Sequence, residues 1–488
     1  MGKKIAVIGS GFSAIAAACY LAQDGNEVTV YEKNKTLGGR ARQLKRDGFT
    51  FDMGPTWYWM PDVFERFFND FGKKPEDFYT LEKLGPAYRV YFGVDDYLTI
   101  GDTLDKIKEE FEKEEPGSAA KLQKFIDEAA DNYEIAIKDL VYRPGVSPLE
   151  LITPTTIKKL GSFFSTISKE VRKSFDNPKL VAILEFPVLF LGAKPSNTPA
   201  FYSFMNYADF GYGTFHPQGG MFQVVDGMVQ LAQDLGVKFQ ISSPVEEILE
   251  RDGNAYGIKI NGKEILADII LSGADYHHTE QLLPRKRRQY SESYWEKKTF
   301  APSSLLFYVG FSQKIKNVEH HTLFFDVDFE KHARAIYDEA AWPDEPLFYA
   351  SFPSKTDNSV APEGAEAGIF LIPLAPGLED TPQLRGQYFE IIMDRFEKLT
   401  TQNVRENIIF KESFCVNDFV KDYNSYKGNA YGMANTLLQT AFLRPKLKSK
   451  KVENLFFTGQ LTVPGPGVPP SLISGKLVAG LIAKNNEL

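Results

Sequence analysis

The sequence predicts an α/β fold in which a parallel sheet is joined to a second, mixed sheet. A strand, glycine turn and helix begin the chain, and a buried strand, Pro/Gly loop and helix end it, which supports the parallel sheet. Between about residues 300 and 425, short aromatic strands alternate with Pro and Gly loops, which suits the mixed sheet. A chain of 488 residues is also too long for one simple core.

The amino-terminal element is predicted to be a strand over residues 3–8, a tight turn and an alanine-rich helix. In the turn, Gly9 permits the change of direction, Gly11 leaves room for a pyrophosphate against the backbone, and Ala14 lets helix and strand pack closely. The next strand delivers Glu32, which stands 21 positions after Gly11. A Rossmann unit places there the acid that accepts a ribose hydroxyl, so these features predict a dinucleotide-binding unit.

The composition limits the classes of partner. The net charge of −8 argues against a general nucleic-acid binder, because neutralising phosphates needs clustered positive surface. Two cysteines, Cys19 and Cys415, fit a reducing compartment, so we expect a cytoplasmic protein. The 39 Phe and 23 Tyr exceed what a dinucleotide fold requires, which indicates either a large apolar ligand or a Phe-rich core.

A glycine-arginine loop follows Glu32. Its sequence, Leu37-Gly38-Gly39-Arg40-Ala41-Arg42, combines backbone that a ligand can approach with guanidinium groups that reach phosphate. A strand then ends in the turn Met53-Gly54-Pro55-Thr56-Trp57. Taken in this order with the first glycine turn, GSGFSA, these segments resemble the FAD-dependent amine-oxidase-like superfamily and, within it, the bacterial phytoene desaturase family of carotenoid desaturases.

The resemblance implies that the dinucleotide is FAD, because in this family the Gly-Gly-Arg loop wraps the FAD pyrophosphate. It also implies a Rossmann-type, glutathione-reductase-like FAD-binding domain with an inserted α+β substrate domain containing a mixed sheet. We expect residues 1–80, 213–300 and 425–488 in the FAD-binding domain, and 81–212 and 301–424 in the domain that binds substrate and contacts a membrane.

Later segments resemble the family's cofactor contacts. Val245 corresponds to a valine whose backbone meets the adenine, and Ser272-Gly273-Ala274-Asp275 resembles an Asn-Ala-Asp motif at a strand end near the cofactor. Near the end of the chain, Gly459 is implied beside the ribityl and pyrophosphate groups, and residues 467–470 beside the isoalloxazine. Many amine oxidases have an acid after the equivalent glycine; Gln460 departs from them and agrees with the carotenoid branch.

The candidate cofactor contacts come from segments along the whole chain. They are Gly9, Gly11, Phe12, Ser13, Ala14, Glu32, Lys33, Gly38, Gly39, Arg40, Arg42, Gly54, Pro55, Thr56, Trp57, Val245, Gly273, Asp275, Gly459, Gln460, Gly467, Val468, Pro469 and Pro470. No catalytic acid or base is assigned, because FAD carries the redox step. His216 is interpreted as structural, for want of a charge partner. The adjacent pairs His277-His278 and His320-His321 share no face, so no metal site is expected.

The implied reaction is the introduction of C=C bonds into an acyclic, phytoene-type carotene by hydride transfer to FAD. Such a hydrophobic polyene has no heteroatom, so an apolar tunnel must select it, with residues 57–59 as either tunnel wall or packed core. The alternatives are a 1-hydroxycarotenoid 3,4-desaturase on the same scaffold, an amine or porphyrinogen oxidase, and a lipid-carrying protein of the GDP-dissociation-inhibitor type. A quinone or oxygen is expected as electron acceptor.

A peripheral contact with a membrane surface is also expected. Apolar residues recur at helical spacing between 155 and 175, and the polar side of that stretch is basic. This pattern is typical of an amphipathic helix on anionic lipid and also of a helix that faces a protein core. The basic run at residues 285–288 is a solvated loop or a lipid-headgroup contact. The most apolar run, residues 180–191, is too short to span a bilayer.

Overall fold

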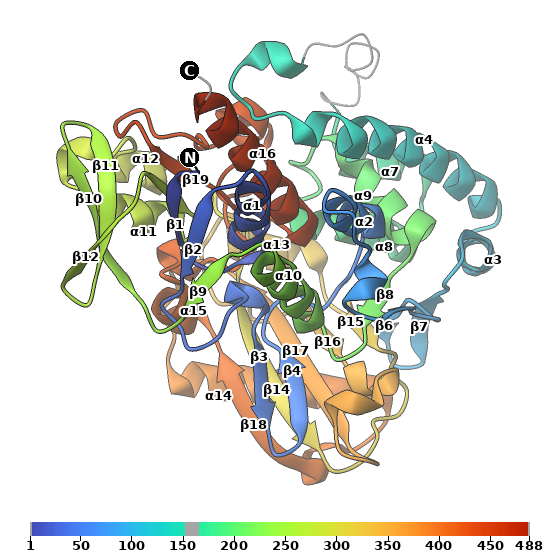
Figure 1. The fold of residues 1–488 in the computed structure, drawn as a ribbon. Helices are drawn as coiled ribbons and strands as arrows, with labels where there is room; N and C mark the ends of the chain where they lie inside the picture. The colour runs from blue at the N-terminus through green and yellow to red at the C-terminus, as the bar shows by residue number, and fades with distance from the viewer. Residues whose placement is uncertain (1, 152–164, 487–488) are drawn as a thin grey trace.

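The computed structural model describes residues 2–151 and 165–486 (Figure 1). Among these residues, five strands form a parallel sheet. In spatial order they are β19 (Leu455–Phe457), β13 (Ile269–Ser272), β1 (Lys4–Ile8), β2 (Glu27–Tyr31) and β9 (Lys238–Gln240). All neighbouring pairs are parallel, so segments from both ends and the middle of the chain meet in one sheet.

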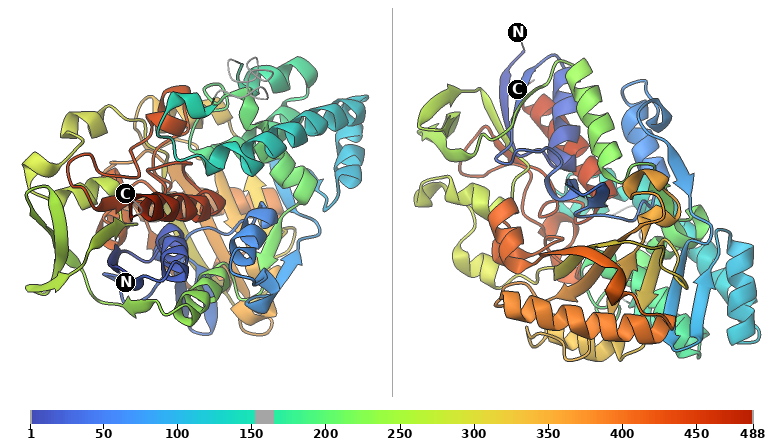
Figure 2. Two further views of the ribbon diagram at one scale, coloured as in Figure 1. Left: turned by 45° about the horizontal axis from the view of Figure 1, so that its top comes forward. Right: turned by 90° about the horizontal axis from the view of Figure 1, so that it is seen from below.

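Helix α1 (Phe12–Gln23) packs against β2, α10 (Phe222–Asp234) and α16 (Val468–Asn486), and Figure 2 shows α1 and α16 side by side. Small residues permit this approach. A Cβ on Gly475 of α16 would lie 2.7 Å from the Ser13 backbone oxygen and 2.8 Å from Ala16 Cβ. The alanine-rich sequence of α1 is therefore explained by close packing on the last helix of the chain.

In the described part of the chain, seven strands form a mixed sheet, which lies at the bottom of Figure 1. Their order is β18 (Ile408–Phe414), β14 (Ser303–Phe311), β17 (Glu366–Leu374), β16 (Phe348–Ser351), β15 (His321–Phe324), β6 (Tyr88–Gly93) and β7 (Asp96–Ile100). The β15–β6 pair is parallel and the other pairs are antiparallel. The predicted α/β class with a mixed second sheet is confirmed.

Helix α14 (Pro382–Thr400) packs on the mixed sheet through aromatic side chains, and Figure 2 shows it running along that sheet. The ring of Phe389 lies 5.0 Å from that of Phe307, and the ring of Phe396 lies 5.4 Å from that of Phe370. Eight buried Phe side chains belong to this core, so part of the high Phe content serves packing, in line with the second of the two sequence interpretations.

The described residues also form three smaller sheets. One is an antiparallel sheet of β10 (Val245–Arg251), β11 (Asn254–Ile260) and β12 (Lys263–Leu266), the second is the hairpin of β3 (Gln43–Arg46) and β4 (Phe49–Asp52), and the third is the antiparallel pair of β5 (Leu81–Lys83) and β8 (Phe215–Pro217), which are distant in sequence. The β3–β4 pair lies against the mixed sheet, since the Phe49 ring is 5.4 Å from that of Phe410 and the Tyr308 hydroxyl donates to Met53 O at 3.1 Å. The glycine-arginine loop is thereby held beside the second sheet.

The remaining helices lie mainly on the upper right and at the rim of Figure 1. They are α2 (Pro61–Asn69), α3 (Leu104–Glu114), α4 (Ser118–Lys138), α7 (Ile167–Ser174), α8 (Pro178–Glu185), α9 (Phe204–Tyr207), α11 (Tyr276–Gln281), α12 (Glu292–Glu296), α13 (Phe329–Tyr337) and α15 (Val416–Tyr423).

The helix predicted over residues 155–175 lies partly outside the described residues. Helix α7 begins only at Ile167, because the Thr166 side chain accepts a hydrogen bond from Lys169 N and caps the helix. The prediction of a helix that runs through Thr166 is therefore wrong. On the basic side of α7, Arg172 pairs with the buried Glu185 at 3.0 Å, so this cation has a partner within the protein.

Across residues 2–151 and 165–486, the helices are all too short or too polar to cross a bilayer.

Candidate cofactor and substrate site

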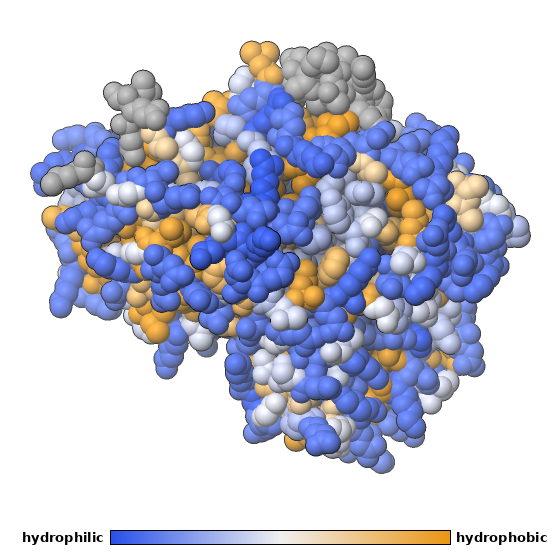
Figure 3. All heavy atoms as spheres, turned by 45° about the vertical axis from the view of Figure 1, so that its right-hand side comes forward, coloured by the Kyte–Doolittle hydropathy of each residue, from blue (hydrophilic) through white to orange (hydrophobic). Residues whose placement is uncertain are grey.

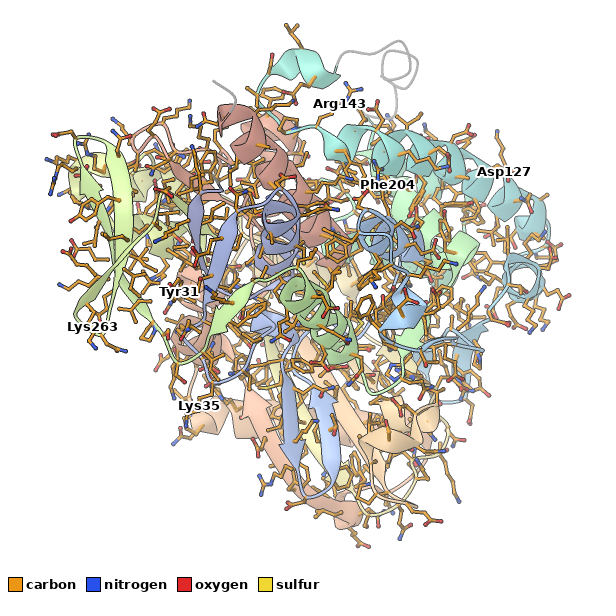
Figure 4. The ribbon with its side chains drawn as sticks, in the orientation of Figure 1. Tyr31, Lys35, Asp127, Arg143, Phe204 and Lys263 are labelled. Carbon is orange, nitrogen blue, oxygen red and sulfur yellow. The ribbon has the colours of Figure 1, made fainter. Side chains whose placement is uncertain are left out.

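A cavity of about 1130 Å³ is lined by residues of both large sheets. Ile8 at the end of β1 lines it from one side, and Leu306 of β14 and Leu371 of β17 line it from the other. Two further lining residues labelled in Figure 4, Phe204 and Arg143, lie on α9 and on the segment that follows α4. The cavity therefore joins the parallel sheet, the mixed sheet and the helical region.

Glycines shape one end of the cavity. Gly9 has φ +89°, and a Cβ on Gly11 would meet no atom within 4 Å, so it would project into open space. The loop at Gly38 is bound to the same turn, because Gly38 N donates to Ser10 O at 3.0 Å. A Cβ on Gly39 would lie 3.3 Å from Gly11 Cα, so backbone from the two glycine segments faces each other without side chains. The result is a cradle that a large group can enter.

Glu32 lies at the carboxyl end of β2, buried and on the cavity wall. Its Oε2 accepts from the Ser10 backbone N at 3.0 Å and the Ser10 hydroxyl at 2.7 Å, and its Oε1 accepts from Asn34 N at 2.8 Å. These bonds hold the carboxylate beside the glycine turn, where a ribose would lie below a bound pyrophosphate.

Arg40 supplies positive charge beside the cradle. Its Nη2 donates to the Ser425 hydroxyl at 3.1 Å, but within residues 2–151 and 165–486 it forms no ion pair, and its buried Nε has no hydrogen-bond partner. Burial lowers the pKa of Arg40, so the site disfavours this unpaired charge. An anionic group in the cradle would pair with the charge of Arg40 and would accept a hydrogen bond from its Nε.

Gln460 lies between two arginines. With its amide oxygen turned toward Arg40, it accepts from Arg40 Nη2 at 3.0 Å and Nη1 at 3.1 Å. Its backbone oxygen accepts from Arg444 Nη1 at 3.2 Å, and Arg444 Nη2 donates to Met433 O at 2.7 Å. Burial lowers the pKa of Arg444 to about 10. An uncharged residue at 460 therefore leaves the charge of Arg40 available to a ligand.

The end of the chain closes the cradle. Gly459 has φ +109°, and a Cβ there would lie 3.1 Å from Ser13 Oγ at the start of α1. Gly459 N donates to Ser474 Oγ at 3.0 Å, which ties the strand end to α16. The cradle, the unpaired buried guanidinium and the carboxylate at the end of β2 fit the adenosine and pyrophosphate groups of FAD.

The structure brings nearly all of the predicted cofactor contacts to this cavity. All of them line it except Ala14 and Arg42. Ala14 lies beneath Gly273, where an added Cβ would be 2.7 Å from Ala14 Cβ. Arg42 pairs with Asp422, and its guanidinium lies 5.3 Å from the Tyr423 ring centre, so this arginine supports the wall without lining it.

The other end of the cavity is mainly aromatic and aliphatic. Trp57 stacks on His321 with ring centres 4.0 Å apart and planes 11° apart, and it also contacts Trp59 and Tyr88 edge to face. Further lining side chains of this kind include Phe186, Leu189, Phe201, Phe204, Phe325, Phe329, Ile336 and Phe348. Such walls exclude water and bind apolar chains by contact area.

A polar group that sequence reasoning missed lies on this wall. The Tyr349 hydroxyl is 2.9 Å from Thr56 Oγ1 and 2.6 Å from His321 Nδ1. Burial lowers the pKa of His321 well below its usual range, so its imidazole is neutral at pH 7. These residues lie on separate strands and loops with no common spacing, so no motif signals the cluster.

His216 has the charge partner that the sequence did not reveal. Its Nε2 lies 3.0 Å from Asp357 Oδ2, and both residues are buried. Neither lines the cavity, which agrees with the structural interpretation of His216. In the part of the chain that the structure describes, no group of three His, Cys, Asp or Glu residues is arranged to hold a metal ion.

The rim of the cavity carries exposed apolar side chains on two adjacent segments. Lys446 Nζ joins the segments by donating to Gly145 O at 2.9 Å and Phe442 O at 2.7 Å. Leu443, which lines the cavity, is 39% exposed, and nearby Leu149 and Leu438 are 71% and 78% exposed. Figure 3, which shows one face of the molecule, has a mainly polar surface with apolar groups between the polar ones. Three large apolar side chains, Leu149, Leu438 and Leu443, are therefore exposed at or near the rim.

Comparison with known proteins identifies relatives over the whole chain. The family model of flavin containing amine oxidoreductases matches residues 12–483. A carotenoid 3,4-desaturase of Haloarcula japonica is 41% identical over 98% of this chain and 97% of its own. A zeta-carotene-forming phytoene desaturase of Myxococcus xanthus is 32% identical over 98% and 93%. A solved oxidoreductase of Methanosarcina mazei has the same fold, with a TM-score of 0.63 and 16% identity over 98% of this chain and 100% of that chain.

Proposed function

Because this chain belongs to the flavin containing amine oxidoreductases and, within them, to the carotenoid desaturases, we propose that it introduces C=C bonds into an acyclic carotenoid. It is a flavin-dependent oxidoreductase with FAD as cofactor. One observation carries the assignment of the site: a single cavity of about 1130 Å³ joins the glycine cradle to an aromatic, apolar compartment. A dinucleotide and a hydrophobic polyene then meet inside one enclosure.

The chain's own residues would hold the cofactor as follows. The Gly9 turn and Arg40 take the pyrophosphate, Glu32 takes a ribose hydroxyl, and Val245 lies at the adenine end. Gly459 and the start of α16 would lie along the rest of the bound FAD. When bound, FAD accepts a hydride equivalent from the substrate.

The apolar compartment then positions and shields the substrate. Trp57 is held by His321 on one face, so it presents a fixed wall to a flat polyene. The aromatic lining keeps water from the reacting carbons. Positive charge that develops on the substrate is delocalised by its own conjugated bonds, so the chain does not need a strong base.

Two reactions are candidates within this class. The relative at 41% identity is named a carotenoid 3,4-desaturase, which supports desaturation at the 3,4 bond. The relative at 32% identity is named a phytoene desaturase, which supports the phytoene-type reaction as second candidate. Incubation of the FAD-loaded protein with phytoene, lycopene and a 1-hydroxycarotenoid in liposomes distinguishes them. We expect the 1-hydroxycarotenoid or lycopene to give a product that absorbs at longer wavelength. If only phytoene gives such a product, the phytoene-type reaction becomes the first candidate.

We also propose the division of the chain into two functional parts. The strands of the parallel sheet come from residues 4–31, 238–272 and 455–457, which supports a cofactor-binding part of residues 1–80, 213–300 and 425–488. The strands of the mixed sheet come from residues 88–100 and 303–414, which supports a substrate part of residues 81–212 and 301–424.

The apolar rim supports a peripheral contact with a membrane. A carotenoid dissolves in lipid, so an entrance flanked by Leu149, Leu438 and Leu443 would receive it without passage through water. A quinone in the same membrane, or oxygen, would reoxidise the cofactor.

A further inference from the structure

The hydroxyls of two tyrosines on the cavity wall differ in their hydrogen bonding from those of Tyr349 and Tyr202. Tyr337 and Tyr431 both line the cavity, and among residues 2–151 and 165–486 neither hydroxyl forms a hydrogen bond with the protein. By contrast, the Tyr349 hydroxyl is bonded to Thr56 and His321, and the Tyr202 hydroxyl lies 2.8 Å from Thr440 Oγ1. Two polar groups are thus left available in a mainly apolar enclosure.

Tyr337 is held in place by the helix that carries it. It is the last residue of α13, which begins with an Asp328 cap. His332 in the same helix accepts from Leu347 N at 2.8 Å through Nδ1, and its Nε2 lies 2.9 Å from Pro373 O. These bonds fix α13 to the mixed sheet, so the position of the Tyr337 ring is set by the fold.

Tyr431 is held equally firmly by backbone pairing on both sides. Ala430 N donates to Pro302 O at 3.0 Å, and Gly432 O accepts from Ala301 N at 2.8 Å. A Cβ on Gly432 would lie 2.7 Å from Gln460 Cγ, so the residue that follows Tyr431 packs against Gln460. Tyr431 itself lines the cavity.

The hydroxyls act on one another through space. Burial raises the pKa of Tyr431 to about 12, and burial also raises the pKa of Tyr337 and Tyr349, to which the negative charge of an ionised Tyr431 would add. Each phenol is therefore neutral at pH 7 and available as donor and acceptor. All three tyrosines line the same cavity.

A pure hydrocarbon in this cavity would leave both free hydroxyls without a partner, and an unpaired polar group in an apolar enclosure is unfavourable. We propose that Tyr337 and Tyr431 form a subsite that binds a hydroxyl group carried by the polyene substrate. One phenol donates to the substrate oxygen and the other accepts its proton, so donor and acceptor needs are met together. This subsite rests on the proposed desaturase function and specifies an oxygenated substrate for it.

Binding to the holoenzyme tests the subsite directly. The flavin is kept reduced so that no turnover occurs, and lycopene and 1-hydroxylycopene, which share one conjugated system, are titrated in detergent while the quenching of tryptophan fluorescence is followed. We expect the hydroxylated compound to bind about tenfold more tightly, in line with one or two net hydrogen bonds. In the double variant Tyr337→Phe/Tyr431→Phe the ratio is expected to fall to about one, through loss of affinity for the hydroxylated compound.

The control is Tyr202→Phe, since Tyr202 also lines the cavity but its hydroxyl already has a partner in Thr440. It should retain the tenfold ratio. FAD content and melting temperature are measured for every variant, so that a folding defect is recognised. Equal binding of the two compounds by the wild type, or an unchanged ratio in the double variant, would overturn the subsite. If the wild type binds neither carotenoid, the proposed function fails as well.

Discussion

With its amide oxygen turned toward Arg40, Gln460 accepts two hydrogen bonds from the Arg40 guanidinium, at 3.0 and 3.1 Å. These residues come from distant parts of the chain, and an uncharged partner at 460 adds no negative charge to that of Asp275, which already acts on Arg40 through space. The position after Gly459 therefore controls how strongly Arg40 attracts an anion.

Replacing Gln460 by Glu would neutralise this attraction. A carboxylate beside Arg40 competes with the pyrophosphate, so we expect FAD affinity to fall about tenfold, which corresponds to ~1.4 kcal/mol. Fluorescence titration of the apoprotein with FAD measures the change. Gln460→Met, which removes the acceptor without adding charge, should have a smaller effect; equal or tighter binding by Gln460→Glu would contradict the assignment of Arg40.

A methyl group at Gly11 would occupy the cradle without straining the fold. Gly11 has φ −73°, which alanine adopts readily, and a Cβ there meets no protein atom within 4 Å. Gly11→Ala is therefore expected to keep the melting temperature of the apoprotein and to weaken FAD binding by about a hundredfold or more. Gly480→Ala is the control, since that Cβ also meets no atom within 4 Å but lies in α16 away from the cavity. Normal FAD binding by Gly11→Ala would remove the cradle from the site.

Asp209 gives stability a defined dependence on pH. Burial raises its pKa to about 8, and the Tyr88 hydroxyl donates to Oδ2 at 2.8 Å. In the unfolded chain this pKa is about 3.9, so the folded state holds the proton more tightly. The contribution of Asp209 to stability therefore falls as pH rises from about 4 to about 8, by up to ~1.4 kcal/mol per pH unit.

Denaturant unfolding at pH 5, 6, 7 and 8 checks this slope. Asp209→Asn removes the titrating group, so its curve should be flatter than that of the wild type. Asp127→Asn, at an exposed position on α4 that Figure 4 labels, should follow the wild type. Parallel curves for Asp209→Asn and wild type would mean that Asp209 is ionised in the folded protein.

Arg172 is predicted to serve stability rather than lipid binding. Its removal in Arg172→Met leaves the buried Glu185 without its cation, at a cost of about 1–2 kcal/mol, because Arg172 itself is half exposed. Thermal unfolding should show this loss, and the double variant Arg172→Met/Glu185→Gln should recover most of it. Lys169→Met, at an exposed position on the same helix, is the control. An unchanged melting temperature together with weaker vesicle binding would assign the basic face to lipid instead.

The apolar rim should control partition to vesicles. Changing Leu149 and Leu438 to Glu places charge where the entrance would enter the interface, so cosedimentation with anionic vesicles is expected to fall about tenfold. Leu266→Glu is the matched control, since Leu266 is 66% exposed on β12 and does not line the cavity. A loss of the same size in this control would show that the effect is general charge repulsion.

The cofactor end of the site was predictable because its requirements are local. Gly11, Glu32 and Gly459 each follow a strand by one to three residues, where the order of strand, turn and helix fixes what a residue can face. The resemblance then joined these segments, and the structure places them around one cavity. Arg42 was assigned from its place in the glycine-arginine loop and Ala14 as the small residue that lets helix and strand pack closely, and neither argument tells whether a side chain lines the cavity wall or supports it.

The substrate end was not predictable in the same way. Tyr337, Tyr349 and Tyr431 lie on a helix end, a strand and a loop, and only tertiary pairing brings them together. The same is true of His216, whose partner Asp357 is 141 residues away in the sequence. Such contacts follow from sheet order, which local periodicity does not encode.

The position of β19 has a consequence for how the enzyme is made. Ribosomes deliver Gly11 and Glu32 long before β19 and the Gly459 segment, because more than 400 residues separate Glu32 from Gly459. A nascent chain therefore lacks one wall of the FAD enclosure until β19 and the Gly459 segment have been synthesised. Flavin capture consequently follows the synthesis of β19, and a polypeptide terminated before it would lack the yellow colour of bound flavin.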